Sequence, residues 1–173
     1  VFSSNNTKAK ILRPIIKHAF GFLLGRKGSR LIVQNQDDLA LFIKKFGIVK
    51  SQILMIRGAG VDNTFYQFLP EPEDKKIVVT LLARMLVDKG IHEFVEAAKV
   101  CKEKGLDIDF HLVGDPDPLN PASIPTNVLN AWNAEGVVLW KGFESNILSI
   151  WANSHISVLP SYREGLPKSL LES

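Results

Sequence analysis

The sequence predicts an α/β protein with a doubly wound, parallel, Rossmann-like sheet. Four short apolar segments read as strands, at residues 77–82, 108–113, 137–140 and 156–159. Helical patterns separate them, and strands that alternate with helices are typical of a parallel sheet covered on both faces. Ligands of such sheets bind beyond the carboxyl ends of the strands, which is where the glycine-containing and charged turns of this chain fall.

Composition limits the classes of function. The chain has 173 residues, 46% of them hydrophobic, which suits a globular domain plus part of another. Its net charge of +3 comes without a basic run interleaved with aromatic residues, so nucleic-acid binding is not indicated. The single cysteine, Cys101, excludes an intrachain disulfide and falls on an apolar helical face, which predicts a buried thiol in a reducing compartment. No signal peptide is visible, and no apolar run approaches the ~20 residues of a spanning helix, so we expect a cytoplasmic protein.

The first predicted element is a helix over residues 7–25. Its apolar residues recur in pairs four apart, which marks one broad stripe. Two interpretations remain open: the stripe packs against a missing part of the protein, or it inserts into an anionic bilayer at the inner face of the membrane. The second draws on the basic residues around the stripe, which are Lys8, Lys10, Arg13, Lys17, Arg26 and Lys27.

The next elements are a strand over 30–34, a helix over 35–46 and a strand over 53–56. Asp37 and Asp38 suit the first turn of that helix, and Gly47 ends it. A glycine pair at 58–60 precedes two prolines rather than a helix, so we interpret it as a linker turn. The chain then divides into the end of an N-terminal domain (1–50), a linker and domain entry (51–76) and a main domain (77–173).

Helices are predicted between the four main strands, over 88–104, 126–134 and 145–152. The first has Asp88 as its expected N-cap and Gly105 after its end. A last helix is predicted from Leu166, because Pro167 suits a first turn. Ser173 follows soon after that start, so both ends of the chain look cut.

The turn before the last helix carries the most chemistry. Backbone N–H groups at Gly165 and Leu166 would face the end of the preceding strand, where a phosphate would be stabilised. Glu164 lies in the loop and Glu172 about two turns into the helix. Carboxylates accept hydrogen bonds from hydroxyl groups, so a ligand with both phosphate and sugar hydroxyls would match this turn.

This turn resembles the motif of retaining nucleotide-sugar glycosyltransferases of the GT-B fold. The shared features are two glutamates separated by seven residues, a glycine after the first, and the wording Pro-Ser-Tyr-Arg-Glu-Gly-Leu-Pro at 160–167. The resemblance covers most of the chain and is strongest over 77–172, which would be the C-terminal, donor-binding domain. It implies transfer of a sugar from a nucleoside diphosphate to an acceptor hydroxyl, with Glu164 as the catalytic residue at the donor sugar and Glu172 on the ribose.

The resemblance also assigns residues at the other strand ends. Arg84 and Lys89 match the family's cations and would clamp the diphosphate, Arg through a fork and Lys as a point charge. Gly114 matches a strand-end glycine at which the ligand passes the backbone. Gly142 follows Trp140 where the family holds the base, although a core Trp and a turn Gly are an equally good reading of these two.

The implied partners are a UDP-linked sugar donor, a lipid-linked or glycan acceptor in bacterial surface-polysaccharide synthesis, and a missing N-terminal domain. No metal and no separate cofactor are expected, because such enzymes use helix dipoles and basic groups on the leaving diphosphate. The fragment alone should bind the donor weakly and catalyse little. The alternative is a non-catalytic nucleotide-binding Rossmann-like domain, since fold does not fix function. A dinucleotide-binding enzyme is disfavoured because no Gly-x-Gly-x-x-Gly follows residues 77–82.

Overall fold

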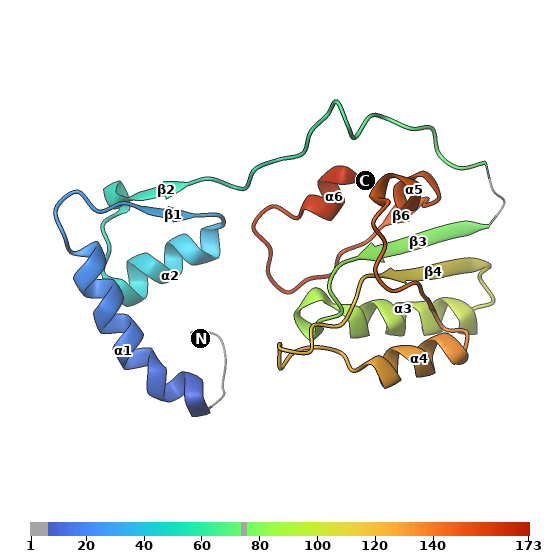
Figure 1. The fold of residues 1–173 in the computed structure, drawn as a ribbon, viewed down its shortest axis with the longest axis horizontal. Coiled ribbons are helices and arrows are strands. Elements are labelled where there is room, and N and C mark those ends of the chain that lie inside the picture. The colour runs from blue at the N-terminus through green and yellow to red at the C-terminus, as the bar shows by residue number, and fades with distance from the viewer. Residues whose placement is uncertain (1–6, 74–75) are drawn as a thin grey trace. The chain divides into compact units, whose positions relative to one another are not determined.

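The chain folds into two compact units, Val1–Ala59 and Gly60–Ser173 (Figure 1). A computed structural model describes residues 7–73 and 76–173. The division falls inside the predicted linker of 51–76, and residues 51–59 belong to the first unit rather than to a connection.

The first unit is a small α/β assembly. It contains α1 (Thr7–Leu24), β1 (Leu31–Val33), α2 (Gln36–Phe46), a 3₁₀ turn (Lys50–Gln52) and β2 (Ile53–Met55). The two strands pair in parallel, with Leu31 opposite Ile53. A core forms around Val33, Ile48 and Ile53, and three rings from the two helices, Phe20, Phe42 and Phe46, meet edge-on or stacked. The predicted helices and strands of this part are therefore present, with Pro14 inside α1.

The second unit contains a four-stranded parallel sheet in the order β5-β4-β3-β6. Its strands are β3 (Ile77–Leu82), β4 (Ile108–Val113), β5 (Leu139–Trp140) and β6 (Ile156–Ser157). The chain starts in the middle of the sheet, adds two strands on one side and then crosses to the other. This arrangement confirms the predicted doubly wound parallel sheet.

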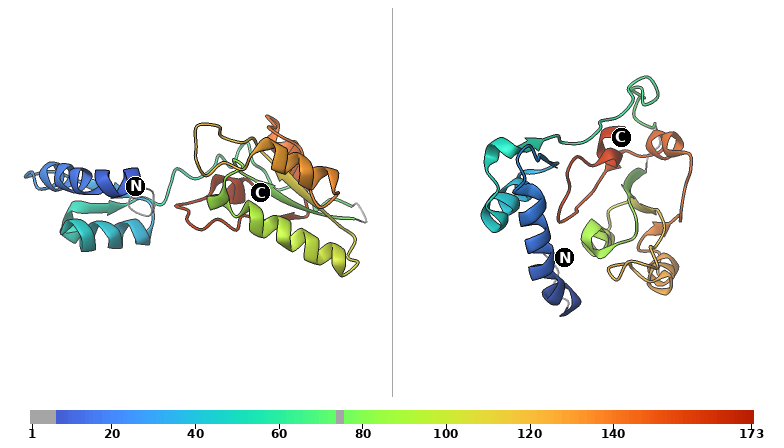
Figure 2. Two further views of the ribbon diagram at one scale, coloured as in Figure 1. Left: turned by 90° about the horizontal axis from the view of Figure 1, so that it is seen from below. Right: turned by 60° about the vertical axis from the view of Figure 1, so that its left-hand side comes forward.

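Helices cover both faces of that sheet. α3 (Ile91–Glu103) and α4 (Thr126–Ala134) lie on one side, and α5 (Ile147–Ala152) lies on the other (Figure 1). Seen from below, α3 and α4 run side by side in front of the strands (Figure 2). α6 (Lys168–Glu172) follows β6 after a loop.

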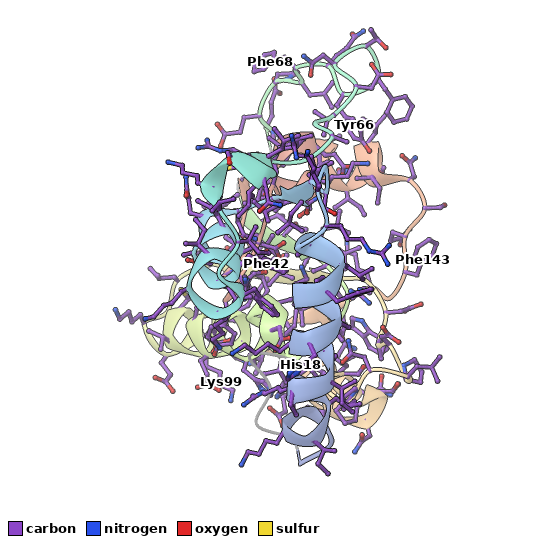
Figure 3. All side chains as sticks on the ribbon, turned by 90° about the vertical axis from the view of Figure 1, so that its left-hand side faces the viewer. His18, Phe42, Tyr66, Phe68, Lys99 and Phe143 are labelled. Carbon is purple, nitrogen blue, oxygen red and sulfur yellow. The ribbon has the colours of Figure 1, made fainter. Side chains whose placement is uncertain are left out.

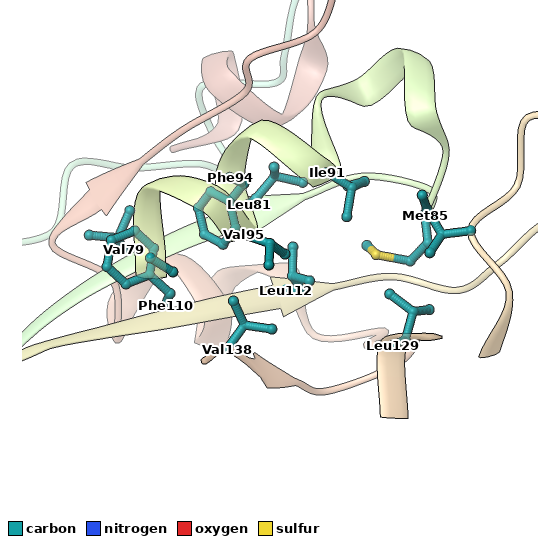
Figure 4. Close-up of a cluster of buried hydrophobic side chains, with 12 residues drawn as sticks. Val79, Leu81, Met85, Ile91, Phe94, Val95, Phe110, Leu112, Leu129 and Val138 are labelled. Atoms are coloured by element: carbon teal, nitrogen blue, oxygen red, sulfur yellow. The ribbon is translucent and has the colours of Figure 1, made fainter. Parts of the chain in front are cut away.

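The core lies between the sheet and the α3–α4 layer (Figure 4). Alternate strand residues such as Leu81 and Leu112 are fully buried there against Phe94 and Val95 of α3 and Leu129 of α4. Cys101 is partly buried against the same core, as its helical register predicts. Burying one such large apolar side chain contributes roughly 1.5–3 kcal/mol of stability. The packing of this layer therefore holds the strands, and the turns at their carboxyl ends, in place.

Three predicted details are wrong. Asp88 is not a helix N-cap, because it lies in a 3₁₀ turn (Val87–Lys89) and Gly90, in the left-handed region at φ 74°, separates that turn from α3. The last helix begins at Lys168 rather than at Leu166, because Pro167 has the extended ψ of 114° and serves as its N-cap. Glu172 is therefore the fifth and last residue of α6, about one turn from its start rather than two.

Candidate functional site

The carboxyl ends of three strands meet through backbone hydrogen bonds. The N–H of Gly114, after β4, donates to the carbonyl of Gly142, after β5, at 2.7 Å. The N–H of Ala83, after β3, donates to Val113 at 3.1 Å, and the indole N–H of Trp140 donates to the Gly114 carbonyl at 2.9 Å. Trp140 also packs against the core, so the reading of Trp140 as a core residue is confirmed. These bonds hold the turns at one rigid edge.

Glycine is required at one of these turns. Gly114 has φ 129°, and a Cβ built on it would lie 2.0 Å from the Ala83 carbonyl oxygen. Gly142 has φ 68° but more room, since its Cβ would lie 3.6 Å from the Asp115 carboxylate. The bare backbone at Gly114 is what lets β3 and β4 end so close together.

A groove of about 440 Å³ opens over these strand ends. It is lined by Ala83, Gly114 and Phe143, which is 72% exposed. Figure 3 labels Phe143, whose ring projects from the ribbon. Arg84 lies directly after β3, and its guanidinium group forms an ion pair at 2.9 Å with Asp117, which lies in the loop after β4. The groove thus combines bare backbone, an aromatic ring and the Arg84 guanidinium group with three carboxylates, those of Asp115, Asp117 and Glu144. Its aromatic ring suits a flat ring of a ligand.

Lys89 and Glu164 form a second pair at this edge. The Lys89 ammonium lies 2.5 Å from the Glu164 carboxylate, and each side chain is only 25% exposed. The two residues are 75 positions apart in sequence. They meet because β6 lies beside β3, which brings the loop after β6 against the turn that precedes α3.

The loop after β6 is fixed to the start of α3 by alternate residues. A Cβ on Gly90 would lie 2.3 Å from the Pro160 carbonyl, so only glycine permits this approach. The Tyr162 N–H donates to the Asp88 carbonyl at 3.1 Å, and its hydroxyl donates to the Glu93 carboxylate. That hydroxyl bond lowers the pKa of Glu93 and, with the Glu93 charge, raises the pKa of Tyr162.

Glu172 lies in a different groove. Its carboxylate is 12% exposed, 3.9 Å from the Lys168 ammonium. It lines a groove of about 450 Å³ with Tyr66, Trp151 and His155 rather than the groove of Arg84. Burial, and then the charge of Glu172 and a hydrogen bond to it, raise the pKa of Tyr66.

The structure therefore sorts the predicted residues into three places. Arg84 and Gly114 line one groove, and Gly142 accepts a hydrogen bond from Gly114. Lys89 and Glu164 form an ion pair, and Glu172 lines a different groove. Gly165 and Leu166 belong to the loop before α6. Glu93 and Asp117 could not be predicted from the sequence, because an acid on a helix and an acid in a proline-rich loop carry no pattern that marks their partners.

No arrangement of three or more His, Cys, Asp or Glu side chains suited to a metal ion occurs among residues 7–73 and 76–173. Over the same residues, no helix has both the length and the apolar character needed to cross a bilayer.

Comparison with known proteins identifies relatives over nearly the whole chain. It is 32% identical over 178 residues to N,N'-diacetylbacillosaminyl-diphospho-undecaprenol alpha-1,3-N-acetylgalactosaminyltransferase of Campylobacter jejuni, an alignment that covers 96% of this chain and 45% of that enzyme. It is 28% identical to UDP-Gal:alpha-D-GlcNAc-diphosphoundecaprenol alpha-1,3-galactosyltransferase of Escherichia coli, covering 99% of this chain and 46% of that enzyme. The chain thus spans about half the length of these curated relatives.

Solved structures share the fold. Anabaena Alr3699/HepE in complex with UDP matches with a TM-score of 0.70 at 21% identity, over 90% of this chain and 45% of that one. A glycosyltransferase from Rickettsia africae matches with a TM-score of 0.65 at 20% identity, over 85% of this chain and 41% of that one. The model of the family described as glycosyl transferases group 1 matches residues 75–173, more than half of the chain. By that match and the 32% identity to a named member of the same class of enzyme, the chain belongs to the group 1 glycosyltransferases.

Proposed function

We propose that the second unit binds the nucleoside-diphosphate sugar of a retaining glycosyltransferase that acts in bacterial cell-surface polysaccharide synthesis. The observation that carries this proposal is the Lys89–Glu164 pair at the carboxyl edge of the sheet, in the turn and loop that follow β3 and β6. A cation for phosphate and a carboxylate for sugar hydroxyls are the two groups that such a donor requires.

The proposed roles follow from charge and position. Arg84 and Lys89 neutralise the departing diphosphate, with the Gly165 and Leu166 N–H groups as further donors, and stabilisation of a leaving group is usually the largest contribution of such a site. Gly114 and Gly142 leave the backbone open to the ligand, and Phe143 offers a face for the base. Glu164 acts at the transferred sugar as the catalytic residue.

The role of Glu172 on the ribose rests on the resemblance of the motif. In the structure Glu172 lines the groove of Tyr66 and does not line the groove of Arg84. No separate cofactor enters this scheme, because the leaving diphosphate is neutralised by basic side chains and backbone N–H groups.

The donor and acceptor are inferred from the names of the relatives. One of them is named for a UDP-Gal donor, and both are named for a diphosphoundecaprenol acceptor and an alpha-1,3 linkage. We infer a UDP-sugar donor and a lipid-linked diphosphate acceptor for the full-length protein. An alpha product is what retention gives from an alpha-linked donor, so the named linkages are consistent with a retaining mechanism.

Calorimetric titration tests the donor site. The chain should bind UDP more tightly than GDP or ADP. Arg84→Ala should lower the affinity for UDP about tenfold or more, because a charged hydrogen bond contributes roughly 1.5–3 kcal/mol, and should change the affinity for uridine little. Lys99→Ala, which removes an exposed ion pair of α3 with Glu96, serves as the control. Absence of binding to all three nucleotides at millimolar concentration would contradict the proposal.

A second experiment separates an enzyme from a non-catalytic binding domain. The full-length protein should transfer sugar from its donor to a lipid-diphosphate acceptor, whereas the 173-residue chain should bind the donor without turnover, since it spans less than half of its relatives. Donor binding without transfer by the full-length protein would favour the non-catalytic alternative.

We also propose that α1 contacts an anionic membrane surface. One stripe of α1, which includes Phe20 and Leu24, packs within the first unit, and a second apolar face points outward. That second face has side chains that are 45–66% exposed, namely Ile11, Leu12, Ile15, Phe22 and Leu23. Residues 1–59 carry eleven Lys and Arg against two acids, a formal charge of +9. Charge complementarity therefore favours an anionic bilayer over an uncharged protein surface.

Vesicle sedimentation tests this contact. The full-length protein should bind phosphatidylcholine vesicles that contain phosphatidylglycerol and not phosphatidylcholine alone, and Phe22→Ser should lower binding about tenfold. Leu119→Ser is the matched control, because Leu119 is 96% exposed and lies in the second unit. Equal losses in both variants, or no binding to anionic vesicles, would show that another part of the protein covers α1.

A further inference from the structure

The Lys89–Glu164 contact supports an inference that rests on the proposed donor site. We propose that Glu164 is the resting counter-ion of Lys89 and that the diphosphate of the donor displaces it. Tyr162 and Glu93 are positioning residues that keep the displaced carboxylate at the sugar end of the ligand. Glu164 thereby has two successive partners, one before the donor binds and one after.

The geometry of the pair carries the first part of this inference. The two charged groups are 2.5 Å apart and each side chain is three-quarters buried. The pair of Arg84 and Asp117 is longer, at 2.9 Å, and its Arg side chain is 63% exposed. Partial burial strengthens the attraction between charges, so Lys89 is the more firmly neutralised of the two cations.

Electrostatics gives the second part. A diphosphate that reaches Lys89 brings its negative charge close to the Glu164 carboxylate, and like charges at such distances repel. Part of the binding free energy of the diphosphate is therefore used to move Glu164 away from Lys89. A bare nucleoside diphosphate has no sugar hydroxyl to receive the carboxylate, so it bears this cost without compensation.

The loop after β6 limits how far Glu164 moves. Pro160, Tyr162 and Glu164 alternate along the loop, and each meets the turn and first residues of α3. The contacts of Pro160 with Gly90 and of Tyr162 with Asp88 and Glu93 do not involve Lys89. When the diphosphate takes Lys89, these contacts remain and the backbone of the loop stays on α3.

Replacement of the carboxylate tests the displacement. Glu164→Gln should bind UDP about three- to tenfold more tightly than the parent, because the diphosphate no longer has to displace a charged partner from Lys89. The gain should vanish when Lys89→Gln is added. Glu96→Gln is the matched control, because Glu96 pairs with Lys99 on the same helix at 2.7 Å, and its UDP affinity should equal that of the parent.

The outcomes separate this inference from the donor site itself. If the parent binds UDP and Glu164→Gln binds it equally or more weakly, the displacement is wrong and the donor site stands. If the parent does not bind UDP, the donor site fails. A gain that persists in the Lys89→Gln background would also overturn the displacement, since it would come from the ligand and Glu164 alone.

The positioning role has its own test in the full-length enzyme. Tyr162→Phe and Glu93→Gln should each lower kcat about tenfold with UDP affinity and donor KM nearly unchanged, because the loop affects Glu164 and not the phosphate contacts. The kcat of the double variant should be no lower than that of either single variant. Additive losses, or a raised KM with unchanged kcat, would overturn the role.

Discussion

At the scale of single residues, the strand-end glycines decide how closely the backbones approach. Gly114 has a positive φ, and the Ala83 carbonyl oxygen occupies the space that a Cβ on Gly114 would need. Gly105, after α3, has φ 69° and open space around it. A substitution at Gly105 therefore meets only the strain of a left-handed backbone, whereas one at Gly114 also meets a steric clash. Gly114 combines both effects, as Gly90 does, and it lines the groove.

Gly114→Ala should therefore destabilise the second unit far more than Gly105→Ala. We expect about 3 kcal/mol or more for the first, from strain plus overlap with the Ala83 carbonyl. The second should cost about 1–2 kcal/mol, for the left-handed conformation alone. Urea unfolding of both variants measures the difference. Similar losses would show that the turn relaxes around the new methyl group.

A half-buried histidine gives a pH dependence. Burial, and then the charge of Lys141, lowers the pKa of His111 below its usual 6.5, and Asp109 opposes this only in part. The unfolded chain then binds more protons between the lowered and the usual pKa, so the stability due to neutral His111 is present above 6.5 and is lost as the pH falls. Urea unfolding from pH 7.5 to 5 should show this loss, and His111→Gln should reduce the slope. An unchanged slope in the variant would assign the pH dependence to other groups.

At the scale of elements, short local signals set helix ends well where a side chain acts on its own backbone. Asn35 begins α2 because its side-chain Oδ1 accepts a hydrogen bond from the Asp38 N–H at 2.7 Å, and Gly47 ends it in the left-handed region. The start of α3 is different, since Gly90 is constrained by Pro160 from another part of the chain. Local rules therefore located α2 and misplaced the N-cap of α3.

The cap of α2 is directly testable. Asn35→Ala should lower the free energy of unfolding of the first unit by about 1 kcal/mol, because the Asp38 N–H loses its acceptor. Asn35→Ser retains an oxygen at the cap and should recover most of the loss. Circular dichroism during urea titration measures both. An equal loss for Ser and Ala would show that the cap hydrogen bond contributes nothing.

At the scale of the whole molecule, the modest net charge of +3 hides two opposite parts. Residues 1–59 carry +9, and residues 60–173, with ten basic and sixteen acidic residues, carry −6. The basic unit suits an anionic surface. In the acidic unit, two of the ten basic residues, Arg84 and Lys89, follow β3 at the carboxyl edge of the sheet. Different partners for the two units are therefore expected on electrostatic grounds.

Limited proteolysis tests the division into units. The described residues between Met55 and Ile77 contain no helix or strand, and Phe68 is 94% exposed there (Figure 3). Chymotrypsin should therefore cut first near Phe65 or Phe68, which leaves the first unit and the sheet of the second unit intact. Mass spectrometry of early products identifies the sites. Early cleavage at the buried Phe94 or Phe110 would contradict this organisation.

The sequence by itself determined the fold class, the order of the elements and the family. Apolar periodicity reports burial directly, and the Glu164 turn carries its own local signature. Only the tertiary structure decided which residues meet. The pairing of Lys89 with Glu164, the bond between Tyr162 and Glu93, and the separation of Glu172 from the groove of Arg84 depend on β6 lying beside β3. Strand order results from packing across the whole sheet, and no local pattern encodes it, so contacts between distant residues follow from the fold alone.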